Sequence, residues 1–206
     1  MDHIAKNYSH FVIIAHFNEG GENVGELLKK IPIGKLLILD KKINGYFDFY
    51  PCVYQDFQKD IINALTEAIK LIKKDNIIKV VFPIDSYYAK EILIEVKLFC
   101  GAHTIVFVEI SDLSEDDPNL GELYINLMES DLVTIIKKIK SKNLIVGKDI
   151  EIIPYNETPL KEVLLDGITV ISTDFEELGR ISAQMILNND KKQIANKFNL
   201  IIRISL

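Results

Sequence analysis

The sequence has no tryptophan and only two cysteines, three methionines and six prolines among its 206 residues. Cys52 and Cys100 stand alone, so neither belongs to a closely spaced pair of the kind that binds zinc or exchanges disulfides. We expect both to be reduced, structural thiols. The four histidines are also scattered without a ligand-type spacing, and no metal site is expected.

Long apolar runs and an excess of positive charge are missing as well. Residues 77–84 form one of the longest apolar runs, and Lys79 interrupts it far short of the roughly 20 residues that cross a bilayer. The N-terminus lacks the apolar core of a signal peptide. The net charge of -6 disfavours a nucleic-acid surface. We therefore expect a cytoplasmic chain that contacts neither a membrane nor DNA by itself.

Motifs for catalysis are absent from the sequence. It contains no Gly-x-Ser-x-Gly elbow, no phosphate-binding loop and no Gly-x-Gly-x-x-Gly turn. These absences favour a binding module over an enzyme, and no cofactor is expected.

Strand-like runs alternate with amphipathic helical segments along the chain, of which 48% is hydrophobic. Helical periodicity follows the runs, with Gly101 expected to end one helix and Asp131 to cap another. Such alternation predicts an α/β fold with parallel sheets, in which ligands bind beyond the carboxyl ends of the strands. The expected strands lie at residues 11–17, 35–40, 77–83, 104–110, 123–128 and 150–154.

The segment 169–180 predicts a strand that passes directly into a helix. Val170 and Ile171 have β-branched side chains, and residues 172–174 (Ser-Thr-Asp) supply cap-type oxygens. Two glutamates follow at the start of the helix, where its dipole favours negative charge. This segment resembles the crossover in the effector-binding domain of LacI-type bacterial regulators, which enters its helix through a Phe-x-x-x-Gly pattern, here Phe175 and Gly179.

The resemblance extends from about Ser9 to the last residue. The sequence Asn-Glu-Thr-Pro-Leu-Lys at residues 156–161 is most similar to regulators in which this domain follows a GntR-type winged helix. It implies a two-lobed, periplasmic-binding-protein-like fold, with the first βα units missing and the N-terminal lobe incomplete. The segments that carry it are residues 35–41, 80–86, 125–134, 146–158 and 169–180.

The resemblance also implies how the chain divides. One lobe would hold residues 1–53 and 176–199, and the other would hold residues 54–171 and 200–206. A small effector, a sugar or sugar phosphate, would bind in the cleft between them. The partners implied are a second copy of the chain, as a homodimer, and DNA contacted through a winged-helix module absent from this sequence.

Several residues fall on positions that bind ligand in the family. Asp40 matches a ligand-binding carboxylate, Ser86 and Lys90 match a serine and an arginine, and Ser130 with Asp131 matches a pair that faces the cleft. Each has a structural alternative, such as loop capping for Asp40, a solvated surface pair for Ser86 and Lys90, and helix capping for Ser130 and Asp131.

Three further candidates come from strand and helix ends. Asn156 offers both a donor and an acceptor to a hydroxyl group, although asparagine is also a frequent turn former. His16 ends the first expected strand and could contact a ligand, although a structural role is the simpler interpretation. Phe175 could stack on a sugar face, although packing in the hinge is the simpler interpretation.

Other functional classes stay open at this point. A transport-type sugar-binding protein would have the same fold, and a small α/β enzyme of flavodoxin-like or nucleotide-binding type would show turnover or a bound cofactor. A regulator remnant that dimerises without sensing a ligand is the third alternative.

Overall fold

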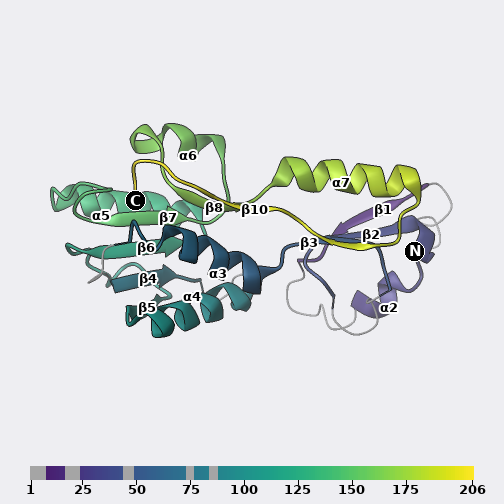
Figure 1. The fold of residues 1–206 in the computed structure, drawn as a ribbon, viewed down its shortest axis with the longest axis horizontal. Coiled ribbons are helices and arrows are strands. Elements are labelled where there is room, and N and C mark those ends of the chain that lie inside the picture. Colours follow the sequence, from purple (N-terminus) through teal and green to yellow (C-terminus); the bar gives the residue numbers. More distant parts are fainter. Residues whose placement is uncertain (1–7, 17–23, 44–48, 73–76, 84–87) are drawn as a thin grey trace. The chain divides into compact units, whose positions relative to one another are not determined.

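A computed structural model gives the fold and describes residues 8–16, 24–43, 49–72, 77–83 and 88–206 (Figure 1). The chain divides into two compact units. Unit 1 comprises Met1–Asp56 and Asp174–Lys197, and unit 2 comprises Phe57–Thr173 and Phe198–Leu206. The polypeptide therefore passes from one unit to the other three times, after residues 56, 173 and 197.

Unit 1 contains a parallel four-stranded sheet in the order β1-β2-β3-β9. Its strands are β1 (Phe11–Ile14), β2 (Leu36–Asp40), β3 (Cys52–Tyr54) and β9 (Gln193–Ala195). Its helices are α2 (Val24–Leu28), a 3-10 turn (Ile33–Lys35) and α7 (Phe175–Asn188).

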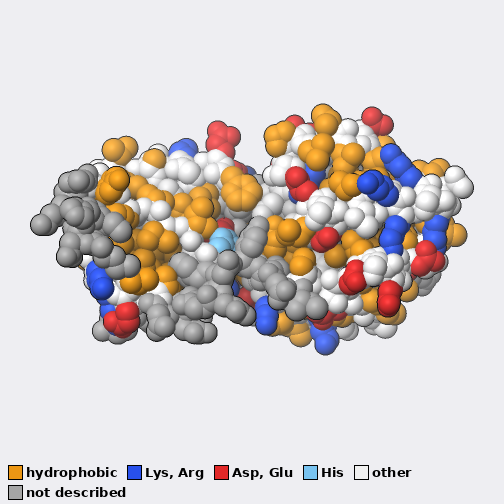
Figure 2. Space-filling model, turned by 180° about the vertical axis from the view of Figure 1, so that it is seen from behind, with side chains coloured by type: hydrophobic (Ala, Val, Ile, Leu, Met, Phe, Trp, Pro, Cys, Tyr) orange, Lys and Arg blue, Asp and Glu red, His pale blue; other side chains and the backbone are white. Residues whose placement is uncertain are grey.

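The two faces of this sheet bury different side chains because successive strand residues point to opposite faces. Ile38 and Cys52 lie on the face where Leu28 of α2 packs. Leu37 and Val53 lie on the other face, under Met185 and its neighbours on α7. Figure 2 shows hydrophobic side chains gathered on the surface of unit 1, the left part of that view.

Unit 2 contains a parallel sheet in the order β5-β4-β6-β7 and an antiparallel pair formed by β8 and β10. The strands are β4 (Ile77–Val81), β5 (Val106–Ile110), β6 (Glu122–Asn126), β7 (Glu151–Pro154), β8 (Val170–Thr173) and β10 (Phe198–Ile201). The helices are α3 (Phe57–Ala68), α4 (Lys90–His103), α5 (Glu129–Ser141), α6 (Pro159–Val163) and a 3-10 turn (Leu164–Asp166).

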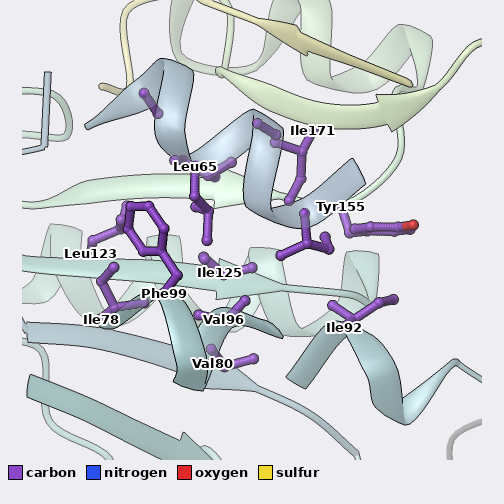
Figure 3. Packing of buried hydrophobic residues seen from close by; sticks show 14 of the residues in the cluster. Leu65, Ile78, Val80, Ile92, Val96, Phe99, Leu123, Ile125, Tyr155 and Ile171 are labelled. Carbon is purple, nitrogen blue, oxygen red and sulfur yellow. The ribbon is translucent and has the colours of Figure 1, made fainter. Parts of the chain in front are cut away.

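Helices cover both faces of the unit 2 sheet, as expected for parallel strands. Leu65 of α3 and Val96 of α4 pack with Ile78 and Ile125 on one face, where Figure 3 shows them pointing toward one another. The apolar side of α5 packs on the opposite face, against Tyr124 and its neighbours. These two layers hold the strand ends of unit 2 in place.

A group of charged residues is buried within this second layer. Lys79 of β4 is only 8% exposed, and its Nζ lies 2.8 Å from Asp116 Oδ1 and 2.8 Å from Glu122 Oε2. The hydroxyl of Tyr124 is 3.1 Å from the same nitrogen. The ammonium group is thus fully surrounded by acceptors, which is what allows a lysine to occupy a central strand.

The expected α/β class with parallel sheets and flanking helices is confirmed, but several local predictions are wrong. Gly101 lies inside α4, which continues to His103 and ends at Thr104 in a left-handed conformation. Asp131 lies inside α5, whose N-cap is Met128. The short strands β3, β9 and β10 were not predicted.

Candidate functional site

Polar side chains from three strands of unit 1 meet at the carboxyl ends of those strands. Asp40 is the last residue of β2 and is 8% exposed. One of its carboxylate oxygens accepts a hydrogen bond from Gln55 Nε2, and the other contacts His16 Nε2. We call these three residues the unit 1 cluster.

Backbone conformation brings this cluster together. Asp40 has a positive φ of 75°, a conformation that aspartate tolerates better than most residues. Its carbonyl oxygen accepts the backbone N–H of Gln55 at 2.9 Å, so that the segment leaving β3 lies beside the end of β2. The sequence predicted Asp40 and His16 as candidates, but it gave no sign of Gln55, which follows a strand too short to detect.

Phe175 is the first residue of α7 and is 49% exposed. Of the three cap-type residues predicted at 172–174, Asp174 caps this helix, since its Oδ1 accepts the backbone N–H of Glu177 at 2.9 Å. Asn196 donates its side-chain N–H to the Asp174 carbonyl at 2.8 Å. The start of α7 is therefore fixed, and the ring of Phe175 is left accessible.

Polar residues also occupy the carboxyl end of the unit 2 sheet. Asn156 follows β7 with a positive φ of 61°, and its side chain is half-buried. Asp131 is half-buried in the first turn of α5, where burial raises the pKa of its carboxyl group and a hydrogen bond from Ser130 partly offsets the rise. Ser130 itself is exposed.

Asn126 is a third residue at this end, and the sequence did not single it out. It is the last residue of β6, is 1% exposed and donates its Nδ2–H to the carbonyl of Met128 at 2.9 Å. Within the described part of the chain, Asn126 Oδ1, Asp131 Oδ2 and Asn156 Oδ1 are buried oxygens without a hydrogen-bond donor. We call these residues the unit 2 cluster.

The loop that carries Asn156 is supported from behind. Lys161 is 2% exposed, and its Nζ donates to the carbonyls of Tyr155 and Asn156 at 2.9 and 2.5 Å. Burial lowers the pKa of this lysine, although nearby carboxylates partly offset the effect. Glu157 pairs with Arg203, at 2.6 Å between Oε2 and Nη2. Both contacts restrict the loop, so Lys161 and Arg203 position Asn156 without belonging to the cluster.

The remaining candidates are less informative. Lys90 is exposed as the first residue of α4, and Ser86 lies outside the described residues. In the part of the chain that the structure describes, no group of three or more His, Cys, Asp or Glu side chains could hold a metal ion. No helix among the described residues is long and apolar enough to span a membrane.

No protein-family model and no curated protein matches the sequence. Solved structures do match. A transcription regulator-like protein from Staphylococcus haemolyticus aligns at a TM-score of 0.74 with 15% identity, over 98% of this chain and 76% of that one. A LacI-family regulatory protein from Chloroflexus aggregans aligns at a TM-score of 0.72 with 18% identity, over 97% of this chain and 77% of that one. This chain has a LacI-type regulator fold. The lac repressor bound to ONPG also aligns, at 0.72 with 16% identity, over 97% of this chain and 65% of that one.

Each of the two clusters lies at the carboxyl ends of the strands of one parallel sheet. In each unit, strand ends present side-chain oxygens or nitrogens at the carboxyl edge of the sheet, the edge at which α/β proteins bind their ligands. At this level of sequence identity the likeness establishes the fold, and what the chain binds has to be argued from its own residues.

Proposed function

We propose that this chain is the ligand-sensing domain of a bacterial transcriptional regulator and that it binds a small sugar-like effector. The observation that carries the proposal is the set of buried polar side chains at the carboxyl ends of both parallel sheets. Buried acceptors without donors are costly, and a ligand that supplies hydroxyl groups removes this cost.

The chemistry of the clusters suits a polyhydroxylated molecule. The unit 2 cluster contributes three acceptor oxygens, from Asn126, Asp131 and Asn156. The unit 1 cluster contributes the carboxylate of Asp40, held in one orientation by His16 and Gln55. Neighbouring sugar hydroxyls donate to such oxygens in pairs, and Lys90 adds a positive charge that a sugar phosphate would use.

The regulatory step follows from differential affinity. The effector would favour whichever conformation of the domain it binds more tightly, as the resemblance to LacI-type regulators implies. In a homodimer, this shift would change the spacing of DNA-binding domains carried on a winged-helix module outside this sequence. The coupling between effector and operator would then be reciprocal, as linkage requires. No catalytic step is part of the proposal.

A thermal-shift screen tests this function. The purified chain is heated with neutral pentoses, hexoses and deoxysugars, with uronic acids and with sugar phosphates. A ligand at a hundredfold excess over its dissociation constant stabilises the folded state by about 2.7 kcal/mol, which corresponds to a rise in Tm on the order of 5–10 °C for a chain of this size.

The variants Asp40→Ala and Asn156→Ala should abolish the ligand-dependent rise in Tm. Asn143→Ala is the matched control, because Asn143 is also an asparagine with positive φ (59°) but is exposed in the turn after α5. A rise that survives in both site variants, or the absence of a rise with every compound, would refute the proposal.

A further inference from the structure

A groove of about 320 Å³ lies in unit 2 at the opposite end of its strands from the unit 2 cluster. Helix α5 begins beside that cluster and ends at Ser141, and residues 144–146 then precede β7 at the amino ends of the strands. The end of α5, residues 144–146, the 3-10 turn (Leu164–Asp166) and Ile204 line the groove. Its volume is at the lower end of the about 300–1,000 Å³ that small-molecule sites occupy.

Most of the lining of this groove is aliphatic. Seven of its nine lining residues are Ile, Leu or Val, so the groove suits an aliphatic group of a ligand. Ile139 is fully buried, whereas Ile145 and Ile204 are 54% and 55% exposed. The chain leaves the groove after Ile204, since Ser205 is buried and Leu206 packs with the layer of α3 and α4. The exposed apolar surface of the groove is thus left uncovered by the last residues.

The two polar lining residues carry opposite charges and come from different elements. Lys140 lies near the end of α5, and Asp166 is the last residue of the 3-10 turn. Both are exposed, and within the described part of the chain neither forms an ion pair with the other or with a third group. The groove therefore presents one free cation and one free anion beside an aliphatic surface.

The backbone around the groove holds its walls in place. Leu165 has φ 54° and ψ 39°, and Asp166 has φ 61°, so two consecutive residues other than glycine adopt the left-handed conformation. This conformation is rare for a bulky residue such as leucine, and it persists where packing imposes it, often at ligand sites. Leu165 packs against the α5 layer. On the other side, a Cβ on Gly147 would lie 1.9 Å from the Ile204 carbonyl oxygen, so the C-terminal segment rests directly on the turn before β7.

We propose that this groove binds a free aliphatic α-amino acid of the size of leucine. The carboxylate of the amino acid pairs with Lys140, its ammonium group pairs with Asp166, and its side chain packs on the aliphatic lining. The pair of charges selects this class of ligand. A fatty acid would leave Asp166 beside an apolar chain without a counter-ion, and an alkylamine would do the same to Lys140.

This inference goes beyond the proposed effector and does not depend on it. All residues of the groove belong to unit 2, and none of them belongs to the unit 2 cluster. A small ligand held by two exposed charges and one aliphatic contact binds weakly, so we expect a dissociation constant on the order of 1 mM for L-leucine.

Methyl NMR of the full chain, titrated with L-leucine to about 20 mM, tests the proposal. The methyl signals of Ile145, Leu165 and Ile204 should shift and saturate, and those of Val106 on the outer strand β5 should not. Three compounds separate the contacts: 4-methylpentanoate lacks the ammonium group, 3-methylbutylamine lacks the carboxylate, and glycine lacks the side chain. Each should bind at least about fivefold more weakly than L-leucine.

Two variants test the charged residues. Lys140→Gln removes the cation, and Asp166→Asn removes the anion while keeping a residue that tolerates the left-handed conformation. Each should weaken L-leucine binding at least about fivefold. Lys137→Gln on the exposed side of α5 is the matched control and should leave it unchanged. Asn156→Ala should also leave it unchanged, which separates this groove from the proposed effector site.

Four results would overturn the proposal. They are the absence of methyl shifts at about 20 mM L-leucine, equal binding of 4-methylpentanoate or 3-methylbutylamine, unchanged binding in both charge variants, and loss of L-leucine binding in Asn156→Ala. The last result would place L-leucine at the unit 2 cluster, and the second would reduce the groove to an unselective apolar surface.

Discussion

Replacing Lys79 with methionine should destabilise unit 2 more than the loss of any surface charge. Lys79 lies in a central strand, and its Nζ is 2.8 Å from a carboxylate oxygen of Asp116 and 2.8 Å from one of Glu122. Burial by itself would lower the pKa of this lysine, but hydrogen bonds to both carboxylates outweigh burial and raise its pKa above the ordinary value. The positive charge is thus part of the folded structure.

The loss of unfolding free energy in Lys79→Met follows from the two buried carboxylates that the substitution leaves unpaired. The side chains of Asp116 and Glu122 are 10% and 5% exposed, and without the ammonium group two buried negative charges would lack a counter-ion. Removing one partner of a buried ion pair costs about 3–5 kcal/mol. With a urea dependence of about 2 kcal/mol per molar, the midpoint for unit 2 should fall by roughly 2 M.

Urea unfolding followed by far-UV circular dichroism measures this effect. Lys137→Met on the exposed side of α5 is the matched control and should change the free energy of unfolding by less than about 0.5 kcal/mol. Adding Asp116→Asn and Glu122→Gln to Lys79→Met should recover part of the loss, because the buried charges are then gone.

The pH dependence of the unfolding free energy gives an independent check on the contribution of Lys79. The folded-state pKa of Lys79 is raised, so its contribution is fully present below its ordinary pKa of 10.5 and is lost as the pH rises through the folded-state value. The reasoning is refuted if Lys79→Met is no less stable than Lys137→Met at pH 7.

Three further predictions concern other parts of the chain. Arg203→Gln removes the 2.6 Å contact with Glu157 and a 2.8 Å bond to the Ile168 carbonyl, and should lower the free energy of unfolding in urea by about 1–3 kcal/mol. Arg180→Gln removes exposed contacts with Glu177 and Gln184 and should lower it by less than about 0.5 kcal/mol. Gly147→Ala should lower the Tm strongly, because the φ of Gly147 is +83° and a Cβ there would lie 1.9 Å from the Ile204 carbonyl oxygen. Gly101→Ala should instead raise the free energy of unfolding by about 0.5–1 kcal/mol, because Gly101 lies inside α4 and a Cβ there would meet no atom within 4 Å. Burial raises the pKa of Cys52 to about 12 and that of Cys100 to about 11. Mass spectrometry should therefore find both thiols unmodified by iodoacetamide in the folded protein at pH 8 and alkylated in urea, and rapid labelling of either thiol in the folded protein would contradict this.

The sequence by itself determined the fold class and the longer elements. Apolar runs such as residues 36–40 predict strands, and the helical periodicity of apolar residues predicts helices. Both patterns are visible in the sequence because a buried strand or an amphipathic helix must present a continuous apolar face. A helix cap among residues 172–174 was also predictable, because the bond that Asp174 makes to the Glu177 N–H spans only three residues. Asp40, Asp131 and Asn156 could be singled out because they follow or flank such elements.

Only the tertiary structure decided which residues meet. Gln55 reaches Asp40 because β3 pairs with β2, and β3 is a three-residue strand stabilised by its neighbours rather than by local propensity. Asn126 is buried because β6 lies between β4 and β7, and Lys79 is tolerated in a central strand because two carboxylates distant in sequence surround it. Pairing and burial of this kind depend on contacts between residues far apart in the chain, which local patterns do not record.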